Sequence, residues 1–380
     1  MKLIAAMSGG VDSAVAAARA HEEGHEVIGV HLALSKNPQK YRSGARGCCT
    51  VEDSHDARRA ADRIGIPFYI WDMSDEFHQG VVEDFLSEYQ SGRTPNPCLR
   101  CNEKIKFAAV LDRARAMGFD GVVTGHYAQM RDTSIDGLSF RAMYRAIDPA
   151  KDQSYVLAVL NGEQLKGAFF PLGDTTKEKI REEAKRRNLA VAAKPDSHDI
   201  CFVPSGDNAG WLRERLGSET GAIIDESGEK LGEHRGAYTY TVGQRRGLGI
   251  TKPREDGAPR YVLRIEPISN TVVVGERDSL AITEIIGERV IWCGPAPKAA
   301  KSGVDSGSAR GMVQVRAHGK AIGCIYTMVG GSDRDEDRDV NGKKIRITCD
   351  EPIYGLAPGQ GAVLYDGDRV VGSSTVLETR

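Results

Sequence analysis

The sequence predicts an α/β protein that opens with a doubly wound parallel sheet and continues into a small, mostly-β central domain and a C-terminal antiparallel β-barrel. Short apolar runs alternate with amphipathic stretches in the first half of the chain, which is typical of crossover units that cover both faces of a parallel sheet. From about Gly206 helical periodicity gives way to short β-branched and aromatic runs, and this pattern continues from Ile282 onward. We expect three domains, at 1–205, 206–281 and 282–380.

The apolar runs of the first domain have the length of buried strands, and the stretches between them carry apolar residues at spacings of three and four. The predicted strands are Lys2–Met7, Val27–Leu34, Ile66–Met73 and Gly121–Thr124, and the predicted helices are Ala14–Glu23, Asp53–Ile64 and Asn102–Met117. In the later domains the predicted strands are Ala237–Val242, Tyr261–Ile265, Thr271–Val274, Gly311–Val315, Lys344–Thr348, Gly361–Leu364 and Val370–Leu377. The polar stretches Pro295–Ser308 and Gly330–Asn341 are predicted to be loops, and Lys177–Arg187 to be the solvated face of a helix.

Composition narrows the classes of function. A net charge of −2 excludes a strongly basic protein that wraps nucleic acid, so any RNA partner must meet a local patch of positive charge. No segment approaches the length of about 20 apolar residues that a bilayer span requires. Eight cysteines in 380 residues are too few for a disulfide framework and are better suited to catalysis or metal binding. We expect a cytoplasmic protein without membrane contact, and by default a monomer.

A turn rich in glycine and hydroxyl groups follows the first predicted strand. Ser8-Gly9-Gly10-Val11-Asp12-Ser13 opens a predicted helix, so that backbone N–H groups and hydroxyls point at whatever anion lies above the turn. The chain contains neither the phosphate-loop pattern with a Lys after its second Gly nor a dinucleotide fingerprint, which disfavours ordinary kinases and dehydrogenases. The combination of strand, turn, Asp, Ser and helix favours phosphate binding over a plain Gly-rich turn.

Two thiols form a Cys-x-x-Cys pair at Cys98 and Cys101. The second immediately precedes the predicted helix, which Asn102 would cap, so we expect the positive end of the helix to lower the pKa of Cys101. Structural zinc and two buried bystander thiols remain alternatives, although no second Cys or His pair lies at a readable distance. A lone Cys201 before Phe-Val-Pro is by itself more typical of a core residue. No chemistry is assigned to Cys48, Cys49, Cys293, Cys324 and Cys349.

The Ser-Gly-Gly-x-Asp-Ser turn resembles the signature of the N-type ATP pyrophosphatases, which split ATP into AMP and pyrophosphate on a doubly wound α/β sheet. The resemblance implies that Asp12 helps to hold Mg²⁺ together with the nucleotide phosphates. Members of this superfamily adenylate different carbonyl groups, so the turn alone leaves the substrate open. One candidate is a small-molecule ligase that forms amides, and a third interpretation is an RNA- or zinc-binding scaffold with a decayed nucleotide site.

Further motifs narrow the resemblance. The turn, the Thr-Pro-Asn-Pro that ends at Pro97, the run Thr124–Tyr127, the run Lys151–Tyr155, Cys201 and the run Thr241–Gly249 occur in this order. With them the chain resembles the bacterial tRNA-specific 2-thiouridylase (MnmA) family over essentially its whole length. The resemblance implies that ATP adenylates the C2 oxygen of the wobble uridine, position 34, in tRNAs for Lys, Glu and Gln.

The family resemblance also implies a path for the sulfur. A cysteine desulfurase or a relay protein delivers sulfur as a persulfide to Cys201, while Cys101 acts as nucleophile and closes a disulfide with Cys201. The persulfide replaces the activated oxygen, so that 2-thiouridine, AMP and pyrophosphate are formed. The target base must leave the anticodon stack, which costs least in a single-stranded loop.

The positions of this chain that match the family's motifs indicate which residues the resemblance implies for each site. The implied ATP contacts are Ala6, Met7, Ser8, Gly9, Gly10, Val11, Asp12, Ser13, Leu32 and Gly125. The implied tRNA contacts are Asn96, Pro97, Cys98, His126, Lys151, Asp152, Gln153, Arg316 and Gln360, of which the first three would face the target base.

Cys98 departs from the family pattern, because the best-known relatives carry Asp at this position. The additional thiol could replace the acid–base function, resolve a persulfide on Cys101, or join Cys101 and Cys201 in holding an iron–sulfur cluster. We favour the relay without a metal, in which Cys98 is an auxiliary thiol.

Overall fold

The computed structural model describes residues 1–35, 51–196, 200–203, 206–252, 254, 256–297, 308–329 and 344–380. The N-terminal part contains a five-stranded, all-parallel sheet in the order β3-β2-β1-β4-β7. The four predicted strands are confirmed to within two residues at each end, whereas the short fifth strand was not predicted. The strands are β1 (Lys2–Ala6), β2 (Glu26–Ala33), β3 (Phe68–Asp72), β4 (Gly121–Val123) and β7 (Ala168–Phe169).

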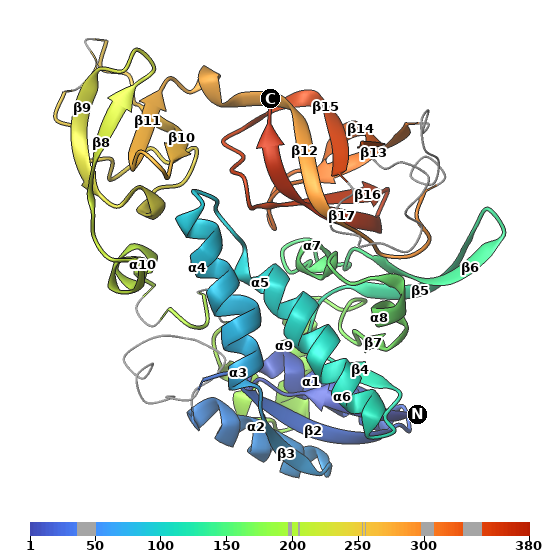
Figure 1. Cartoon of the computed structure of the whole chain (residues 1–380). Coiled ribbons are helices and arrows are strands. Elements are labelled where there is room, and N and C mark those ends of the chain that lie inside the picture. Colours follow the sequence, from blue (N-terminus) through green and yellow to red (C-terminus); the bar gives the residue numbers. More distant parts are fainter. Residues whose placement is uncertain are drawn as a thin grey trace.

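Helices cover both faces of this sheet, which confirms the doubly wound arrangement. On one face α1 (Val11–Glu22), α2 (Val51–Ile64) and α9 (Lys177–Arg186) contribute apolar side chains to a core cluster that includes residues of β1. On the other face α4 (Glu83–Gln90) and α6 (Val110–Ala116) bury aromatic and aliphatic side chains. Figure 1 shows the two helical layers around the sheet.

The central part forms a four-stranded sheet in the order β10-β11-β8-β9. Its strands are β8 (Thr220–Asp225), β9 (Lys230–Arg235), β10 (Tyr261–Glu266) and β11 (Thr271–Gly275). The prediction of a strand at Ala237–Val242 was wrong, because residues Ala237–Thr239 form a short 3₁₀ turn, η5. Gly236 precedes it with a φ of +113°, a conformation that favours glycine and ends the strand.

The C-terminal part is a closed antiparallel barrel of six strands in the order β12-β15-β14-β13-β16-β17, closed by pairing of β17 with β12. This confirms the predicted barrel. Its strands are β12 (Ala281–Trp292), β13 (Ala309–Gln314), β14 (Ile322–Val329), β15 (Lys344–Tyr354), β16 (Gly361–Asp366) and β17 (Arg369–Thr379).

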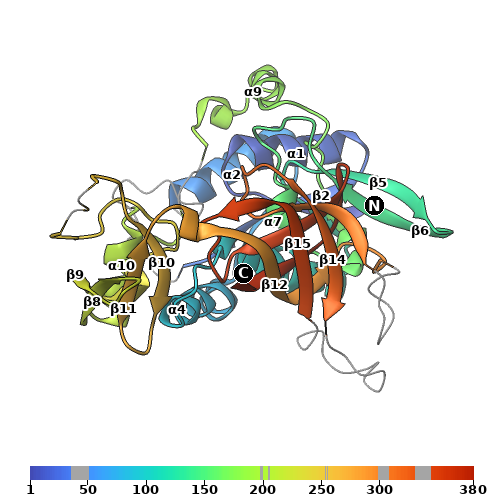
Figure 2. The ribbon, with the colours of Figure 1, turned by 90° about the horizontal axis from the view of Figure 1, so that it is seen from above.

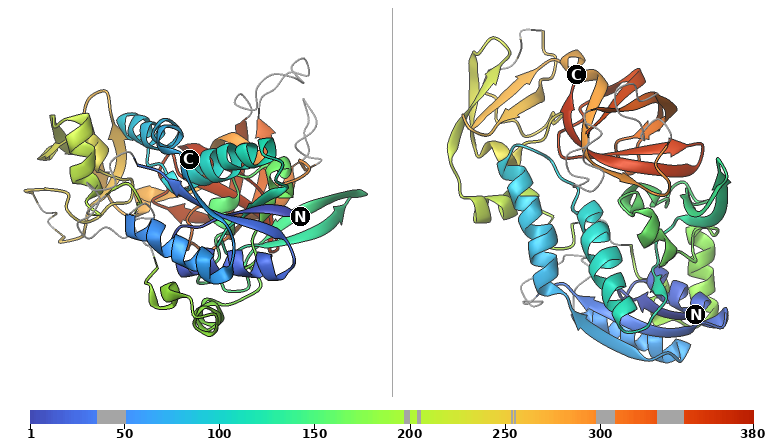
Figure 3. Two further views of the ribbon diagram at one scale, coloured as in Figure 1. Left: turned by 90° about the horizontal axis from the view of Figure 1, so that it is seen from below. Right: turned by 45° about the vertical axis from the view of Figure 1, so that its right-hand side comes forward.

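A hairpin from the first part of the chain extends the barrel sheet, which the sequence did not predict. It consists of β5 (Gln129–Ile135) and β6 (Leu138–Tyr144), and β6 pairs with β17 at Tyr144 and Arg369. Figure 2 shows the hairpin projecting beyond the rest of the molecule, and Figures 2 and 3 show the central sheet and the barrel side by side. The barrel therefore contacts elements of the N-terminal part directly.

No helix in the described ranges is both long and apolar enough to cross a membrane. Cys48, Cys49 and most of the two predicted loops at 295–308 and 330–341 lie outside the described residues. The remaining elements are α3 (Ser74–Phe77), η2 (His78–Val82), α5 (Pro97–Arg100), η3 (Cys101–Ala109), α7 (Ser154–Leu157), α8 (Gly162–Lys166), η4 (Ala190–Ala193), α10 (Asn208–Leu216) and η6 (Asp278–Leu280).

Candidate active site

The turn predicted to bind phosphate, Ser8–Ser13, is formed by local contacts between its own residues. Gly10 is the N-cap of α1, and the Ser8 N–H donates to the Ser13 hydroxyl at 3.2 Å. That hydroxyl in turn donates to the Gly10 carbonyl oxygen at 3.1 Å. Gly9 has a φ of +77°, and a Cβ at this position would lie 2.2 Å from the carbonyl oxygen of Asp53. Glycine is therefore required here by conformation and by space.

The predicted ATP-binding residues gather at the carboxyl ends of three neighbouring strands. Ala6 and Met7 lead from β1 into the turn, and Leu32 lies on the adjacent strand β2. Gly125 follows β4, where an added Cβ would lie 2.6 Å from the backbone of Asp12 and Ser13. This close approach explains a glycine beyond β4 and leaves the mouth of the turn lined by backbone, as phosphate binding requires.

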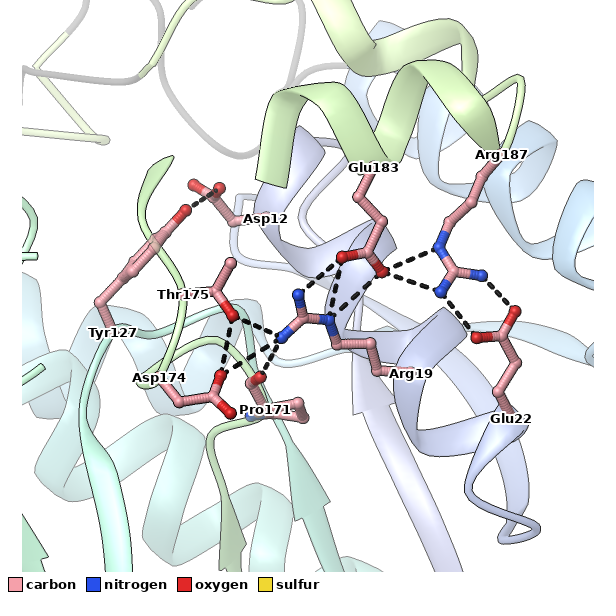
Figure 4. Close-up of polar contacts among 9 residues, drawn as sticks. All are labelled: Asp12, Arg19, Glu22, Tyr127, Pro171, Asp174, Thr175, Glu183 and Arg187. Carbon is pink, nitrogen blue, oxygen red and sulfur yellow. Dashed lines mark hydrogen bonds and ion pairs between the residues drawn. The ribbon is translucent and has the colours of Figure 1, made fainter. Parts of the chain in front are cut away.

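Asp12 is held by two groups that the sequence analysis did not identify. The Lys177 ammonium lies 2.7 Å from each of its carboxylate oxygens, and the Tyr127 hydroxyl donates to one of them at 2.7 Å. Figure 4 shows the contact between Tyr127 and Asp12. Burial and the neighbouring Asp12 carboxylate raise the pKa of Tyr127 far above its ordinary value, so this phenol stays a donor.

Lys177 corrects the interpretation of residues 177–187 as a purely solvated face. It is the first residue of α9 and is 8% exposed. A cation in the first turn is unfavourable beside the positive helix end, and this was the available sequence signal that Lys177 has a special partner. Its ammonium also lies 2.9 Å from the Asp196 carboxylate.

Ion pairs hold α9 against α1 and thereby place Lys177 over the turn. The Arg19 guanidinium lies 2.6 Å from Glu183, and it also donates to the Pro171 carbonyl oxygen at 2.8 Å. Arg187 pairs with Glu183 at 2.8 Å and with Glu22 of α1. Figure 4 shows this chain of contacts between the two helices.

The Cys-x-x-Cys pair lies one turn deeper in a helix than predicted. Residues 97–116 form a continuous helical run through α5, η3 and α6, and its N-cap is Asn96, whose side chain accepts from the Cys98 N–H at 3.0 Å. The prediction that Asn102 caps the helix was wrong, because its amide donates to the Val156 carbonyl oxygen at 2.9 Å. The helix therefore begins at Pro97, beside Cys98 and one turn before Cys101.

Cys101 and Cys201 contact the same apolar cluster. Cys101 is buried within the core that β1 shares with α4 and α6, and Cys201 packs against that core. Phe202 anchors the second thiol's segment, since its ring centroid lies 5.3 Å from that of Phe85 and 5.3 Å from that of Trp211. The fold thus places two thiols that are 100 residues apart in the sequence against one core cluster.

The three thiols do not form a metal site as placed. Cys98 is exposed, Cys101 is buried and Cys201 is intermediate, and all cysteines in the described part of the chain are thiols. Across the described ranges no three His, Cys, Asp or Glu side chains are grouped so that they could hold a metal ion. The arrangement does not fit an iron–sulfur cluster on these three residues.

Asp152 and Gln153, two predicted tRNA contacts, make hydrogen bonds to other parts of this chain. The Asp152 carboxylate accepts from the backbone N–H groups of Ala146 at 2.9 Å and Ser154 at 3.2 Å, and Arg145 pairs with it at 3.0 Å. The Gln153 amide oxygen accepts from the Tyr127 N–H at 3.0 Å. The neighbouring Lys151 pairs with Asp196 at 2.7 Å. These residues shape the loop beside Tyr127.

His126, another predicted tRNA contact, is buried. One ring nitrogen lies 2.7 Å from the Thr124 hydroxyl and the other 3.5 Å from the Lys106 ammonium. Burial, together with the charge of Lys106, lowers the pKa of His126 well below its ordinary value. The imidazole is therefore neutral, and its ring packs beside Phe107 and Phe170.

Residues of the barrel form an ion pair and hydrogen bonds with both ends of the segment that contains the Cys-x-x-Cys pair. Arg93 pairs with Glu288 of β12 at 2.7 Å, and the Thr94 N–H donates to the Pro358 carbonyl oxygen at 2.7 Å. At the other end the Arg100 guanidinium donates to the Thr375 hydroxyl at 2.9 Å.

The two predicted tRNA contacts of the barrel lie near this junction. Exposed Arg316 donates to the Gly355 carbonyl oxygen at 2.7 Å. The side-chain oxygen of Gln360 is buried and has no hydrogen-bond partner among the described residues.

Family models match three consecutive parts of the chain. The tRNA methyl transferase HUP domain family matches residues 1–205, the tRNA methyl transferase PRC-barrel domain family matches 209–276, and the aminomethyltransferase β-barrel domain family matches 282–376. A solved 4-thiouridine synthetase–RNA complex with bound ATP aligns with 56% of this chain and 50% of that chain, at 17% identity and a TM-score of 0.33.

Curated relatives are similar from end to end. A tRNA-specific 2-thiouridylase MnmA from Nocardioides sp. is 58% identical over 384 residues, covering 100% of this chain and 98% of the relative. One from Thermobifida fusca is 58% identical over 381 residues, covering 100% of this chain and 96% of the relative. Since identity of this degree covers the full length of the chain, the chain belongs to the tRNA-specific 2-thiouridylase MnmA family.

Proposed function

We propose that this protein is an ATP-dependent tRNA-uridine 2-sulfurtransferase, which replaces the C2 oxygen of the wobble uridine in tRNAs for Lys, Glu and Gln by sulfur. The observation that carries the proposal is that one domain contains both a turn suited to anion binding, at Ser8–Ser13, and two cysteines, Cys101 and Cys201, that contact one core cluster. Family membership over the full length supports tRNA as the substrate.

In the first step the uridine C2 oxygen attacks the α-phosphorus of ATP, and pyrophosphate leaves. Backbone N–H groups at the start of α1 and the hydroxyls of Ser8 and Ser13 would bind the departing phosphates. The Lys177 ammonium lies next to this cradle and would neutralise part of their charge. The products of this step are pyrophosphate and an O-adenylated uridine.

Mg²⁺ fits the carboxylate at the turn. The Asp12 side chain is 30% exposed and stands at the rim of the cradle, and one carboxylate together with substrate phosphates is a usual ligand set for this ion. Bound there, the ion would supply charge neutralisation for the leaving pyrophosphate. Because Lys177 occupies both carboxylate oxygens, metal binding requires this pair to open or shift.

In the second step the terminal sulfur of a Cys201 persulfide attacks C2, and AMP leaves with the former C2 oxygen. The Cys101 thiolate then attacks the Cys201 sulfur, which breaks the S–S bond of the persulfide and leaves sulfur on the base as a thiocarbonyl. A Cys101–Cys201 disulfide remains, and a thiol reductant must reduce it before the next turnover. A persulfide donor, such as a cysteine desulfurase or a relay protein, reloads Cys201.

Cys98 is exposed at the start of the helical run, where its N–H is bound by Asn96. A thiol at this place suits an auxiliary role, such as resolving a misplaced persulfide, and the relay itself uses Cys101 and Cys201. The central sheet and the barrel would supply the remaining tRNA contacts, with exposed Arg245 and Arg246 in the central part. The proposed domains are 1–205, 206–281 and 282–380.

The proposal is tested with purified protein, ATP, Mg²⁺, a persulfide donor and unmodified tRNA. Nucleoside mass spectrometry after digestion is expected to show a uridine in which sulfur replaces oxygen, together with one AMP per modified base. Cys101→Ser and Cys201→Ser are expected to abolish the thiouridine. Release of AMP without modification of the RNA would contradict tRNA as the substrate, and modification that survives both substitutions would contradict the relay.

A further inference from the structure

One carboxylate is surrounded by three cations near the phosphate-binding turn. Asp196 lies 2.9 Å from the Lys177 ammonium, 2.7 Å from the Arg181 guanidinium and 2.7 Å from the Lys151 ammonium. Lys177 is shared, since the same ammonium contacts both carboxylate oxygens of Asp12. Asp12 and Asp196 are thus two carboxylates that contact the same buried ammonium.

A second contact ties the same short segment to the other side of the turn. The Lys194 ammonium donates to the Gly9 carbonyl oxygen at 2.9 Å and pairs with Asp53 and Asp56 of α2, each at 2.7 Å. Burial lowers the pKa of Lys194, but these two carboxylates outweigh it and raise the pKa above its ordinary value. Residues 194–196 are therefore bound to the turn at Gly9 and, through Lys177, at Asp12.

Arg181 fixes the backbone of this segment to α9. Its guanidinium donates to the carbonyl oxygens of Ala192 at 3.1 Å and Lys194 at 3.0 Å, in addition to its contact with Asp196. Asp196 stands five residues before Cys201 in the chain. Its contacts with Lys151, Lys177 and Arg181 therefore anchor the chain a short distance before that thiol.

We propose that Asp196 is a positioning residue that couples the nucleotide site to the Cys201 segment through the cation it shares with Asp12. This inference rests on the proposed function. The phosphates of ATP bring negative charge to the turn, beside the Lys177 ammonium. Attraction of Lys177 toward those phosphates weakens its hold on Asp196, and the carboxylate then relies on Lys151 and Arg181.

The charge state of Asp196 suits this role. Burial raises the pKa of its carboxyl group, but hydrogen bonds from Lys151 and Lys177 outweigh burial and hold the pKa well below its usual range. The side chain is therefore ionised at neutral pH, and Asp196→Asn removes one full negative charge with almost no change in shape. Asp196→Glu keeps the charge and is the conservative variant.

The coupling is tested by measuring how fast Cys201 is alkylated, with and without saturating ATP and Mg²⁺, by peptide mass spectrometry on the full-length protein. In the wild type we expect ATP to change the rate by about fivefold or more. Asp196→Asn is expected to abolish this dependence and to retain ATP binding by calorimetry, whereas Asp196→Glu restores most of the dependence. Asp174→Asn, which changes an acid that is 74% exposed near the start of α9, is the matched control.

The outcomes separate the inference from the proposed function. A wild type that thiolates tRNA but alkylates at a rate independent of ATP would overturn the coupling and leave the function intact. Full dependence on ATP in Asp196→Asn would overturn the coupling in the same way. A wild type that neither binds ATP nor thiolates tRNA would instead contradict the proposed function. Circular dichroism of each variant establishes that it is folded before the rates are compared.

Discussion

The Lys177 ammonium lies 2.7 Å from both carboxylate oxygens of Asp12, although the two residues are 165 positions apart in the chain. Under the proposed function this cation has two roles. It compensates the Asp12 charge when the turn is empty, and it would provide positive charge for phosphates bound at the turn. Loss of this cation therefore affects both stability and nucleotide binding.

Lys177→Met is expected to weaken ATP binding and to lower stability. Removing the ammonium leaves Asp12 without its bidentate partner and Asp196 with one cation fewer, so the free energy of unfolding should fall by about 3 kcal/mol. Calorimetric titration with ATP and Mg²⁺ should show an affinity loss of about tenfold or more, with Lys177→Arg between Met and wild type. Lys179→Met, on the exposed side of α9, is the control. Equal ATP affinity in Lys177→Met and wild type would contradict a phosphate role.

Gly125→Ala is expected to disturb the nucleotide site through steric overlap of the added methyl group with the turn. The new Cβ would lie 2.6 Å from the backbone of Asp12 and Ser13, so the turn or β4 must move. Overpacking of this kind costs about 1–3 kcal/mol, and we expect ATP affinity to fall by about tenfold. Gly162→Ala is matched, because its Cβ would meet its nearest neighbour at an ordinary 3.5 Å. Similar ATP affinities in the two variants would show that the close approach is tolerated.

The contact between Arg100 and Thr375 is expected to position the Cys-x-x-Cys segment against the barrel. Arg100→Lys loses the fork that reaches Thr375, and a double-mutant cycle with Thr375→Val should give a coupling energy of about 1 kcal/mol in unfolding experiments. Single-turnover thiolation should slow more than ATP binding weakens, because the turn lies on other elements. Strict additivity of the two substitutions would remove the argument for positioning by the barrel.

Cys98 is expected to be the first of the site thiols to react with iodoacetamide, because its side chain is exposed whereas Cys101 is 8% exposed. Cys98→Ser should retain formation of thiouridine, since the proposed relay uses Cys101 and Cys201. Peptide mapping after timed alkylation and nucleoside analysis of the tRNA provide the two measurements. Complete loss of thiolation in folded Cys98→Ser would place Cys98 in the relay itself.

Alkaline pH is expected to destabilise the protein through buried thiols of the barrel region. Burial raises the pKa of the Cys293 thiol to about 12, whereas an exposed thiol titrates near 8.5. Since the folded state holds the proton more tightly, this contribution to stability is complete below about pH 8.5 and decreases as pH rises toward 12. For Cys293 alone the decrease between pH 8 and 10 is about 2 kcal/mol.

Urea denaturation at several pH values measures this slope. Cys293→Ala should show a smaller loss of stability between pH 8 and 10 than the wild type. The buried thiols Cys324 and Cys349 contribute with the same sign, so part of the slope remains in Cys293→Ala. Parallel slopes in Cys293→Ala and wild type would refute the assignment to Cys293.

Features with a local cause were predictable from the sequence. The turn at Ser8–Ser13 depends on the φ of Gly9 and on hydroxyls within six residues, and the strands of the parallel sheet are recognisable as apolar runs. The errors were also local. Asn96 and Asn102 both stand where a cap is chemically suitable, and the choice between them depends on whether Pro97 begins the helix, as it does. The run at Ala237–Val242 has strand composition but follows a glycine that ends the strand.

The sequence by itself determined the fold class and the conformation of the turn at Ser8–Ser13, and it singled out the cysteines of the proposed relay, because each depends on residue types within one or two neighbouring elements. Only the tertiary structure decided which cation meets Asp12, that Asp196 shares it, and that Asp152 and His126 are buried. Long-range ion pairs leave no periodicity in the sequence, since they depend on where α9 packs on α1. The same reason explains why the contact of the barrel with Arg100 could be found only in the folded molecule.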